Sequence, residues 1–190
     1  MKISESDALL IVDLQNDFCP GGALAVPRGD EIISGINELI PRFKQVAASQ
    51  DWHPKNHCSF QPQGGPWPPH CIQNTRGAAL HSALLQDRIG VRIFKAQQPD
   101  QDAYSAFERT SLSEELKIRK IRRIFICGLA TDYCVKESAL DAVKSGFLAV
   151  VLTDLIRAVN VRPGDDRKAL NQMKQAGIGL SQSSELQENN

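Results

Sequence analysis

The chain has 190 residues, of which 42% are hydrophobic, and this is enough for one domain with a buried core. Its 22 basic residues balance 22 acidic residues, so the composition offers no basic surface for nucleic acid or an anionic membrane. No apolar run approaches the roughly 20 residues that cross a bilayer. The five cysteines form no CxxC pair and no export signal precedes the first apolar run, so we expect free thiols in the cytoplasm.

Short apolar runs alternate with amphipathic segments along the chain. The first run, 8–12, is nearly continuous and predicts a strand buried on both faces. Apolar residues at helical spacing follow over 30–43, with Asp30 as a candidate N-cap. The remaining segments predict strands at 46–49, 91–94, 123–128, 147–152 and 178–180, and helices at 112–116, 134–145 and 165–176.

This alternation predicts an α/β fold, a parallel sheet with helices on both faces, within a single domain over 1–190. Ligands of such sheets bind at the carboxyl ends of the strands, so functional side chains should follow strands. The segment 51–80 lacks periodicity and is rich in proline, glycine, histidine and tryptophan. A loop of this length in a compact domain is usually functional or disordered, and its composition favours function. We expect the polar tail after Leu186 to be frayed.

Two ionisable residues follow predicted strands directly. Asp13 follows the first strand, where a buried acid is costly unless it is paired or catalytic. The alternative is an ordinary loop or capping acid. Lys95 follows the run at 91–94, and taken alone it is best interpreted as a solvated lysine. At the same sheet edge as Asp13, it could instead form a buried ion pair.

Cys134 is the candidate nucleophile. The preceding strand ends at Gly128, so Cys134 falls in the first turn of the next helix, which Thr131 or Asp132 can cap. The helix dipole and free N–H groups there favour a thiolate and can receive an oxyanion. A strand, a sharp turn, a nucleophile and a helix form an arrangement used for acyl transfer. The alternative, a small buried hydrophobe, is the favoured interpretation for Cys127 inside the strand.

Asp51 and His53 are separated by one residue, so in extended backbone their side chains point to the same side. His70, across the long loop, could complete a set of two histidines and one carboxylate. Such a set suits Zn²⁺, Fe²⁺ or Mn²⁺ with open positions for water or substrate, although the motif also occurs without metal. His57 and His81 lack this context and are interpreted as surface or hydrogen-bonded residues.

Aromatic residues near these motifs could form a flat pocket. The candidates are Phe18, Trp67 and Tyr104, with ordinary core packing as the alternative. Core packing is the favoured interpretation for Phe107.

Together these motifs resemble the nicotinamidases of the isochorismatase-like cysteine hydrolase superfamily. The resemblance covers nearly the whole chain and rests on segments in the family's order: DLQNDF at 13–18, SQDWHP at 49–54, WPPHC at 67–71, FK at 94–95, YSAF at 104–107 and GLATDYCV at 128–135. It implies a three-layer sandwich whose mostly parallel, six-stranded sheet is flanked by helices.

The resemblance also implies roles for individual residues. Asp13, Lys95 and Cys134 would form a catalytic triad, and the backbone N–H groups of Ala130 and Cys134 would hold the oxyanion, with a cis peptide bond between Leu129 and Ala130. A divalent metal, which isochorismatases lack, would lie beside the triad.

Asp51, His53 and His70 would be the metal ligands, with Zn²⁺ as the expected ion and Fe²⁺ or Mn²⁺ as alternatives. The chain departs from the family pattern in two ways. Ala96 follows the lysine where the family usually has glycine, and 54–69 contains no acid, so only three protein ligands are expected.

The predicted activity is hydrolysis of nicotinamide to nicotinate and ammonia through a thioester on Cys134, a step of NAD salvage, with pyrazinamide as a further substrate. One alternative is a related amidase acting on an N-carbamoyl or ureido compound. Others are a two-His-one-carboxylate oxygenase, which would leave Cys134 without a role, and a non-catalytic binding module. The expected partner is a small molecule, and the sequence does not decide between a monomer and a homo-oligomer.

Overall fold

A six-stranded sheet forms the middle layer of the structure, a computed structural model that describes residues 1–187. The strands are β1 (Asp7–Val12), β2 (Gln45–Asp51), β3 (Val91–Lys95), β4 (Arg123–Leu129), β5 (Leu148–Arg157) and β6 (Gly179–Ser181). They lie in the order β3-β2-β1-β4-β5-β6, and every neighbouring pair is parallel. The predicted six-stranded sheet is confirmed and is parallel throughout.

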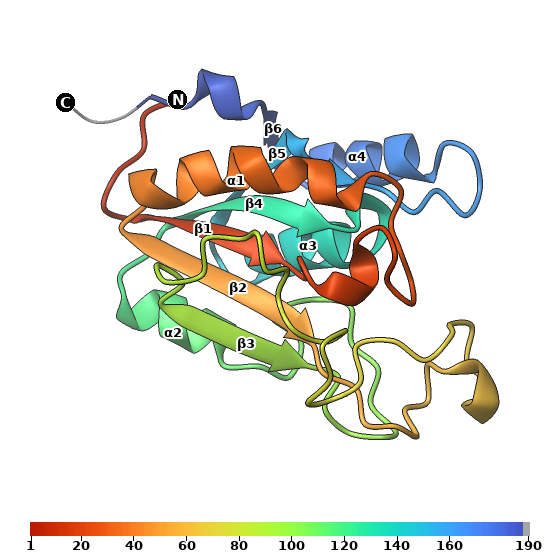
Figure 1. Ribbon diagram of the computed structural model, residues 1–190. Helices are drawn as coiled ribbons and strands as arrows, with labels where there is room; N and C mark the ends of the chain where they lie inside the picture. Colours follow the sequence, from red (N-terminus) through yellow and green to blue (C-terminus); the bar gives the residue numbers. More distant parts are fainter. Residues whose placement is uncertain (188–190) are drawn as a thin grey trace.

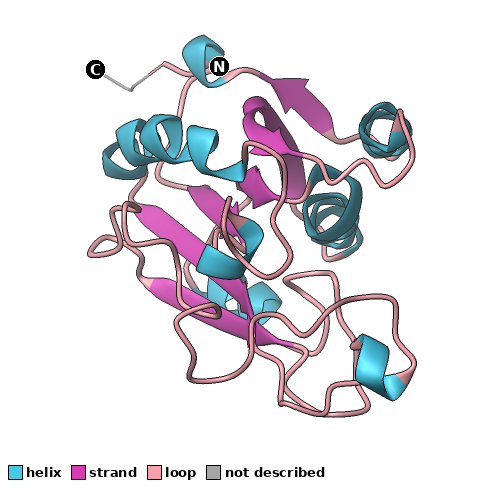
Figure 2. Ribbon diagram, turned by 45° about the vertical axis from the view of Figure 1, so that its right-hand side comes forward, coloured by secondary structure: helices cyan, strands magenta, loops and turns pink. Residues whose placement is uncertain are grey.

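Helices cover both faces of this sheet (Figures 1 and 2). Within the described residues the α-helices are α1 (Ile33–Leu39), α2 (Leu112–Ile118), α3 (Lys136–Lys144) and α4 (Asp165–Gln175). Apolar side chains of α1 pack with Leu9 and Ile11 of β1, whereas those of α2, α3 and α4 share the opposite core with Leu10. Because successive side chains of a strand point to opposite faces, a strand covered on both sides is an unbroken apolar run, as β1 is.

The helix predicted over 30–43 is interrupted. Tight 3₁₀ turns at Gly29–Ile32 and Ile40–Arg42 flank the shorter α1. Pro41 has no N–H group with which to continue the α-helical hydrogen bonds. Asp30 lies inside the first turn and its side chain makes no capping bond, so its prediction as an N-cap is wrong.

Two predicted strands are longer than the apolar runs that suggested them. β2 continues to Asp51, and its pairing with β3 places Asp51 directly opposite Lys95. β5 continues to Arg157 after a register shift against β4. The strand extension matters for function because it brings two ionisable residues of different motifs to one point of the sheet edge.

The two ends of the described chain meet at one side of the molecule. Lys2 forms a bridge with Gln187, so the tail remains paired just past Leu186. The rest of the tail that we expected to be frayed, 188–190, lies outside the described residues. Among residues 1–187, no helix combines the length and the apolarity needed to span a membrane.

The carboxyl ends of β1, β2, β3 and β4 gather at one edge, beside the long loops that Figure 2 shows in pink. Backbone geometry turns the chain sharply at this edge, since Asp13 and Ala96 follow β1 and β3 with φ of 46° and 52°. A left-handed φ favours glycine, which is a physical reason for the glycine that the family resemblance implied where this chain has Ala96. A Cβ at Gly128 would lie 2.1 Å from the Val12 carbonyl oxygen, so only glycine lets β4 approach β1 there.

Candidate active site

Lys95, the last residue of β3, lies at the centre of a buried charge cluster. Its ammonium nitrogen lies 3.0 Å from Asp13 Oδ2 and 3.5 Å from Cys134 Sγ. It also forms an ion pair with Asp51 Oδ1 and donates a hydrogen bond of 3.2 Å to the Ala103 carbonyl oxygen. Lys95 is 1% exposed and Asp13 is fully buried, so the buried ion pair considered from the sequence is present.

Asp13 is held in place through both of its carboxylate oxygens. Ser49 Oγ donates a hydrogen bond of 2.7 Å to Oδ1, while Oδ2 faces Lys95. Oxygen and sulfur atoms of Asp13, Asp51 and Cys134 all lie within 4.8 Å of one another. The strands and the turn after β4 therefore bring the three predicted triad residues together, with Asp51 as an additional member.

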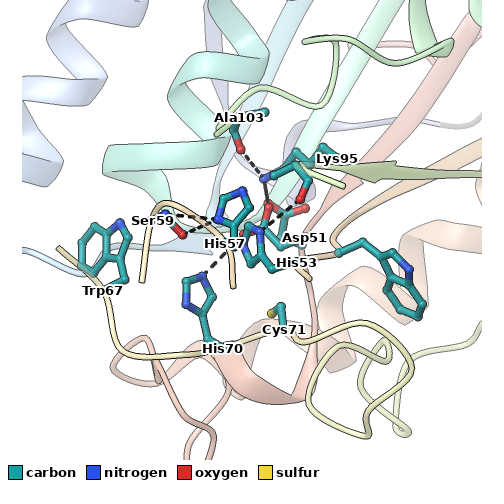
Figure 3. A network of polar contacts seen from close by, with 12 residues as sticks. Asp51, His53, His57, Ser59, Trp67, His70, Cys71, Lys95 and Ala103 are labelled. Atoms are coloured by element: carbon teal, nitrogen blue, oxygen red, sulfur yellow. Dashed lines mark hydrogen bonds and ion pairs between the residues drawn. The ribbon is translucent and has the colours of Figure 1, made fainter. Parts of the chain in front are cut away.

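Asp51 divides its carboxylate oxygens between two sets of partners (Figure 3). Oδ1 contacts Lys95, whereas Oδ2 lies 3.5 Å from His53 Nε2 and 4.0 Å from His70 Nε2. Sequence reasoning missed the contact between Asp51 and Lys95. The contact depends on the register of β2 against β3, in which these two residues are opposite each other, and no sequence motif gives that register.

The chemistry of Asp51, His53 and His70 fits a divalent cation. His53 Nδ1 lies 3.3 Å from the Ala96 carbonyl oxygen and His70 Nδ1 lies 2.8 Å from the Pro68 carbonyl oxygen. Since a carbonyl only accepts, each Nδ1 carries the proton, and each Nε2 directs a lone pair toward the shared carboxylate. Burial also lowers the pKa of His70, which keeps it in the neutral form that binds metal.

Burial dominates the electrostatics of the cluster. It raises the pKa of Asp13, against the opposing effect of Lys95. Burial acts in the same direction on Asp51, but the Lys95 ammonium holds the pKa of Asp51 well below its usual value. These opposite shifts leave Asp51 as a permanent carboxylate and make Asp13 the stronger base of the pair.

Burial also raises the pKa of the Cys134 thiol well above its usual value, although Lys95 opposes the shift. The raised pKa favours the protonated thiol at neutral pH. Desolvation thus opposes the thiolate that the helix terminus was expected to favour. Attack by Cys134 then requires a nearby base to remove the proton.

The turn that carries Cys134, Thr131–Val135, is wider than an α-helical turn and leads into α3. Tyr133 within it has φ −125° and ψ −105°, which bends the backbone just before the cysteine. Neither Thr131 nor Asp132 caps the helix, so that prediction is wrong.

Asp132 instead ties the nucleophile turn to the loop after β5. Its carboxylate accepts the backbone N–H groups of Val159 and Asn160 at 3.0 and 2.8 Å. The peptide bond between Leu129 and Ala130 is cis, as the family resemblance implied.

A pocket opens over Cys134 and the candidate metal ligands. Its walls include the predicted residues Phe18, Trp67 and Tyr104, together with Ala130. Trp67 Nε1 donates a hydrogen bond of 3.1 Å to the Tyr104 hydroxyl, which fixes both rings. Asp13 and Lys95 are not among the lining residues and lie beneath the pocket floor.

Sequence reasoning missed several pocket residues. Tyr133 packs edge-on to Trp67 with 5.2 Å between ring centroids, and its position beside the nucleophile was the available signal. Val159 reaches the pocket from a loop that carries no motif, so nothing in the sequence pointed to it.

His57, Phe107 and Cys127, for which ordinary roles were expected, are buried or partly buried. His57 is fully buried and its ring nitrogens lie 2.7 Å from Ser59 Oγ and 3.1 Å from the Gln101 carbonyl oxygen. It is therefore a hydrogen-bonded histidine and not a surface one. Phe107 packs against one hydrophobic core, and Cys127 is buried within the other, as core packing predicts.

Comparison with known proteins places this site in a family. The model of the isochorismatase domain matches residues 7–185. The chain belongs to the isochorismatase family, which confirms the resemblance seen in its motifs.

Among curated proteins, the nicotinamidase of Escherichia coli (strain K12) is 45% identical over 198 residues, covering 91% of this chain and 93% of the relative. The nicotinamidase/pyrazinamidase of Mycobacterium tuberculosis is 37% identical, covering 91% and 97%. Nicotinamidases are thus similar to this chain over nearly their whole length.

Solved structures of similar proteins also match this chain over nearly its whole length. PnC1 from L. infantum, in complex with nicotinate, is 41% identical with a TM-score of 0.95, and covers 100% of this chain and 99% of its own. The pyrazinamidase of Pyrococcus horikoshii, in complex with zinc, is 48% identical with a TM-score of 0.88, covering 93% and 99%.

The position of Lys95 yields a prediction about the reactivity of Cys134. Lys95→Ala removes the ammonium that lowers the pKa of the thiol, so the thiolate fraction at neutral pH falls about tenfold for each added pKa unit. Alkylation of Cys134 by iodoacetamide, followed by mass spectrometry, should slow accordingly. Lys44→Ala, which removes an exposed lysine paired with Glu5, should leave the rate unchanged. An equal rate in wild type and Lys95→Ala would contradict a role for Lys95 in tuning the thiol.

Proposed function

We propose that this protein is a nicotinamidase that converts nicotinamide to nicotinate and ammonia by nucleophilic catalysis at Cys134. The observation that carries the proposal is the position of the Cys134 thiol. It lies beneath an aromatic-walled pocket, in one buried cluster with Lys95 and two carboxylates. Similarity to nicotinamidases over nine-tenths of the chain supports this substrate.

Proton transfer from Cys134 to Asp13 begins the reaction. Asp13 Oδ2 has no hydrogen-bond partner among the described residues apart from its ion pair with Lys95, so it can accept the thiol proton. Its raised pKa makes it a stronger base than an ordinary carboxylate. Lys95 holds Asp13 in place and stabilises the negative charge as it moves from oxygen to sulfur.

The sulfur then forms a bond to the amide carbon, and the carbonyl oxygen becomes an oxyanion. The backbone N–H groups of Ala130 and Cys134, two residues that line the pocket, would hold this oxyanion. Asp13 returns its proton to the departing nitrogen and ammonia leaves. Water then cleaves the thioester, which restores the thiol and releases the carboxylic acid.

Asp51, His53 and His70 would hold a divalent ion, and we propose Zn²⁺ because two imidazoles and one carboxylate suit it and leave positions open. When bound, the ion would supply a Lewis-acid position that binds and orients the ring nitrogen of the substrate. Phe18 and Trp67 flank the same space and would confine a flat ring. All five cysteines are free, which supports a reducing compartment such as the cytoplasm as the working environment.

A related amidase acting on an N-carbamoyl or ureido compound would use the same triad. The buried histidine pair favours nicotinamide over that alternative, because a substrate without a ring nitrogen would leave the site unused. The oxygenase alternative gives no role to Cys134, which here contacts Lys95.

Ammonia release from nicotinamide tests the proposed activity. Cys134→Ala should lose nearly all turnover, because the thioester cannot form without its sulfur. Cys127→Ala is the matched control, since Cys127 is buried in β4 away from the pocket, and it should cost only about 1 kcal/mol of stability. Substantial turnover by Cys134→Ala would overturn the mechanism.

Benzamide tests the role assigned to the metal site. It shares the carboxamide and flat ring of nicotinamide but lacks the ring nitrogen. Loss of one apolar contact between a substrate and its pocket costs only ~1–3 kcal/mol. Loss of the proposed bond between the ring nitrogen and the metal ion should cost more. Nicotinamide should therefore be strongly preferred, and a chelator should remove most of that preference. Equal initial rates on the two amides would exclude the templating role and leave the cysteine mechanism standing.

A further inference from the structure

Gln15 is a fully buried polar side chain two residues beyond Asp13, and the mechanism above gives it no role. Its Nε2 donates hydrogen bonds to the carbonyl oxygens of Asp51 and Ala78, both at 2.8 Å. Its Oε1 accepts the backbone N–H of Asp51, also at 2.8 Å. The side-chain amide thus pairs with both the N–H and the C=O of Asp51, as a neighbouring strand would.

The path of β1 explains why the Gln15 side chain, and not a strand, pairs with Asp51. The ladder between β1 and β2 runs from Ala8 opposite Gln45 to Ile11 opposite Ala48, and Asp13 adds one last bond to Ser49. The backbone then turns away, since Asp13 has a left-handed φ of 46°. Without another partner, the Asp51 peptide groups on the β1 side would be buried and unpaired, which is costly.

Asp51 is therefore held from both sides. β3 pairs with it on one side, in the register that places Asp51 opposite Lys95. The amide of Gln15 replaces the missing strand on the other side. The carboxylate that serves both Lys95 and the two histidines is thereby carried by a backbone with little freedom to rotate.

We propose that Gln15 is a positioning residue for Asp51, which it fixes so that one carboxylate oxygen faces Lys95 and the other faces His53 and His70. Its effect on turnover rests on the proposed function, whereas its effect on metal binding does not. Partners that orient metal ligands typically change metal affinity or activity by about 10–100-fold when they are removed.

Gln50 provides a matched control. It is also buried, with 4% exposure, and its Nε2 donates to the same Ala78 carbonyl oxygen at 2.7 Å. Among the hydrogen bonds of the described residues, it makes none to the peptide groups of Asp51. Methionine has nearly the shape of glutamine and makes none of these bonds, so Gln15→Met and Gln50→Met differ chiefly in the pairing with Asp51.

The experiment compares the two variants by zinc affinity, measured by competition with a chelator on folded protein. Both variants lose buried side-chain hydrogen bonds, and the melting temperature of each reports the resulting loss of stability. Gln15→Met should bind zinc at least about tenfold more weakly than wild type, while Gln50→Met stays within about twofold. At saturating zinc, kcat for nicotinamide should also fall in Gln15→Met and not in Gln50→Met. Bound zinc does not restore the backbone bonds of Asp51, so Asp51 positions Lys95 less well than in wild type.

Gln15→Asn gives the comparison if Gln15→Met does not fold, since it keeps the amide but shortens its reach by one methylene. It too should weaken zinc binding. Folded Gln15 variants that bind zinc as tightly as Gln50→Met would overturn the proposal. If wild type does not release ammonia from nicotinamide, the proposed function fails, whereas the zinc comparison still decides whether Gln15 positions Asp51.

Discussion

The contact between Lys95 and Asp51 joins two sites that the sequence presents as separate motifs. With both acids ionised, Asp13, Asp51 and Lys95 are three buried residues that carry a net charge of −1. Uncompensated buried charge is costly, so a cation on the histidine side of Asp51 would relieve the excess. The triad and the metal site are therefore parts of one electrostatic unit, in which the Asp51 carboxylate is shared.

The order of the strands makes this unit possible. β3, β2, β1 and β4 are successive neighbours, and Lys95, Asp51, Asp13 and Cys134 lie at or just beyond their carboxyl ends. Because neighbouring strands lie only about 4.8 Å apart, side chains from four strands can meet within a few ångströms. The thiol still needs the wide turn after β4, which brings it over the buried lysine.

The sequence predicted those features that depend on local pattern. Buried strands appear as apolar runs, and Asp13 and Lys95 were found because they follow such runs directly. The contact of Asp51 with Lys95 could not be predicted, since it depends on how far β2 extends and on its register with β3. The bonds from Gln15 to Asp51 join residues 36 apart in sequence, so they depend on the left-handed turn at Asp13. The burial that raises the pKa of the Cys134 thiol could not be predicted either, because burial is set by the whole fold.

Zinc affinity of Lys95→Met tests most directly whether the two sites share Asp51. Methionine is unbranched like lysine, ends one heavy atom earlier and carries no charge. Two unit charges of the same sign 4 Å apart repel each other by about 4 kcal/mol at an effective dielectric constant of 20. If Lys95 and the metal ion both contact the Asp51 carboxylate, the two cations repel each other, and removal of the ammonium ends that repulsion. Zinc should then bind Lys95→Met at least about tenfold more tightly, since 1.4 kcal/mol is a factor of ten in affinity. An affinity equal to that of wild type would show that the triad and the metal site are independent, and would contradict this account.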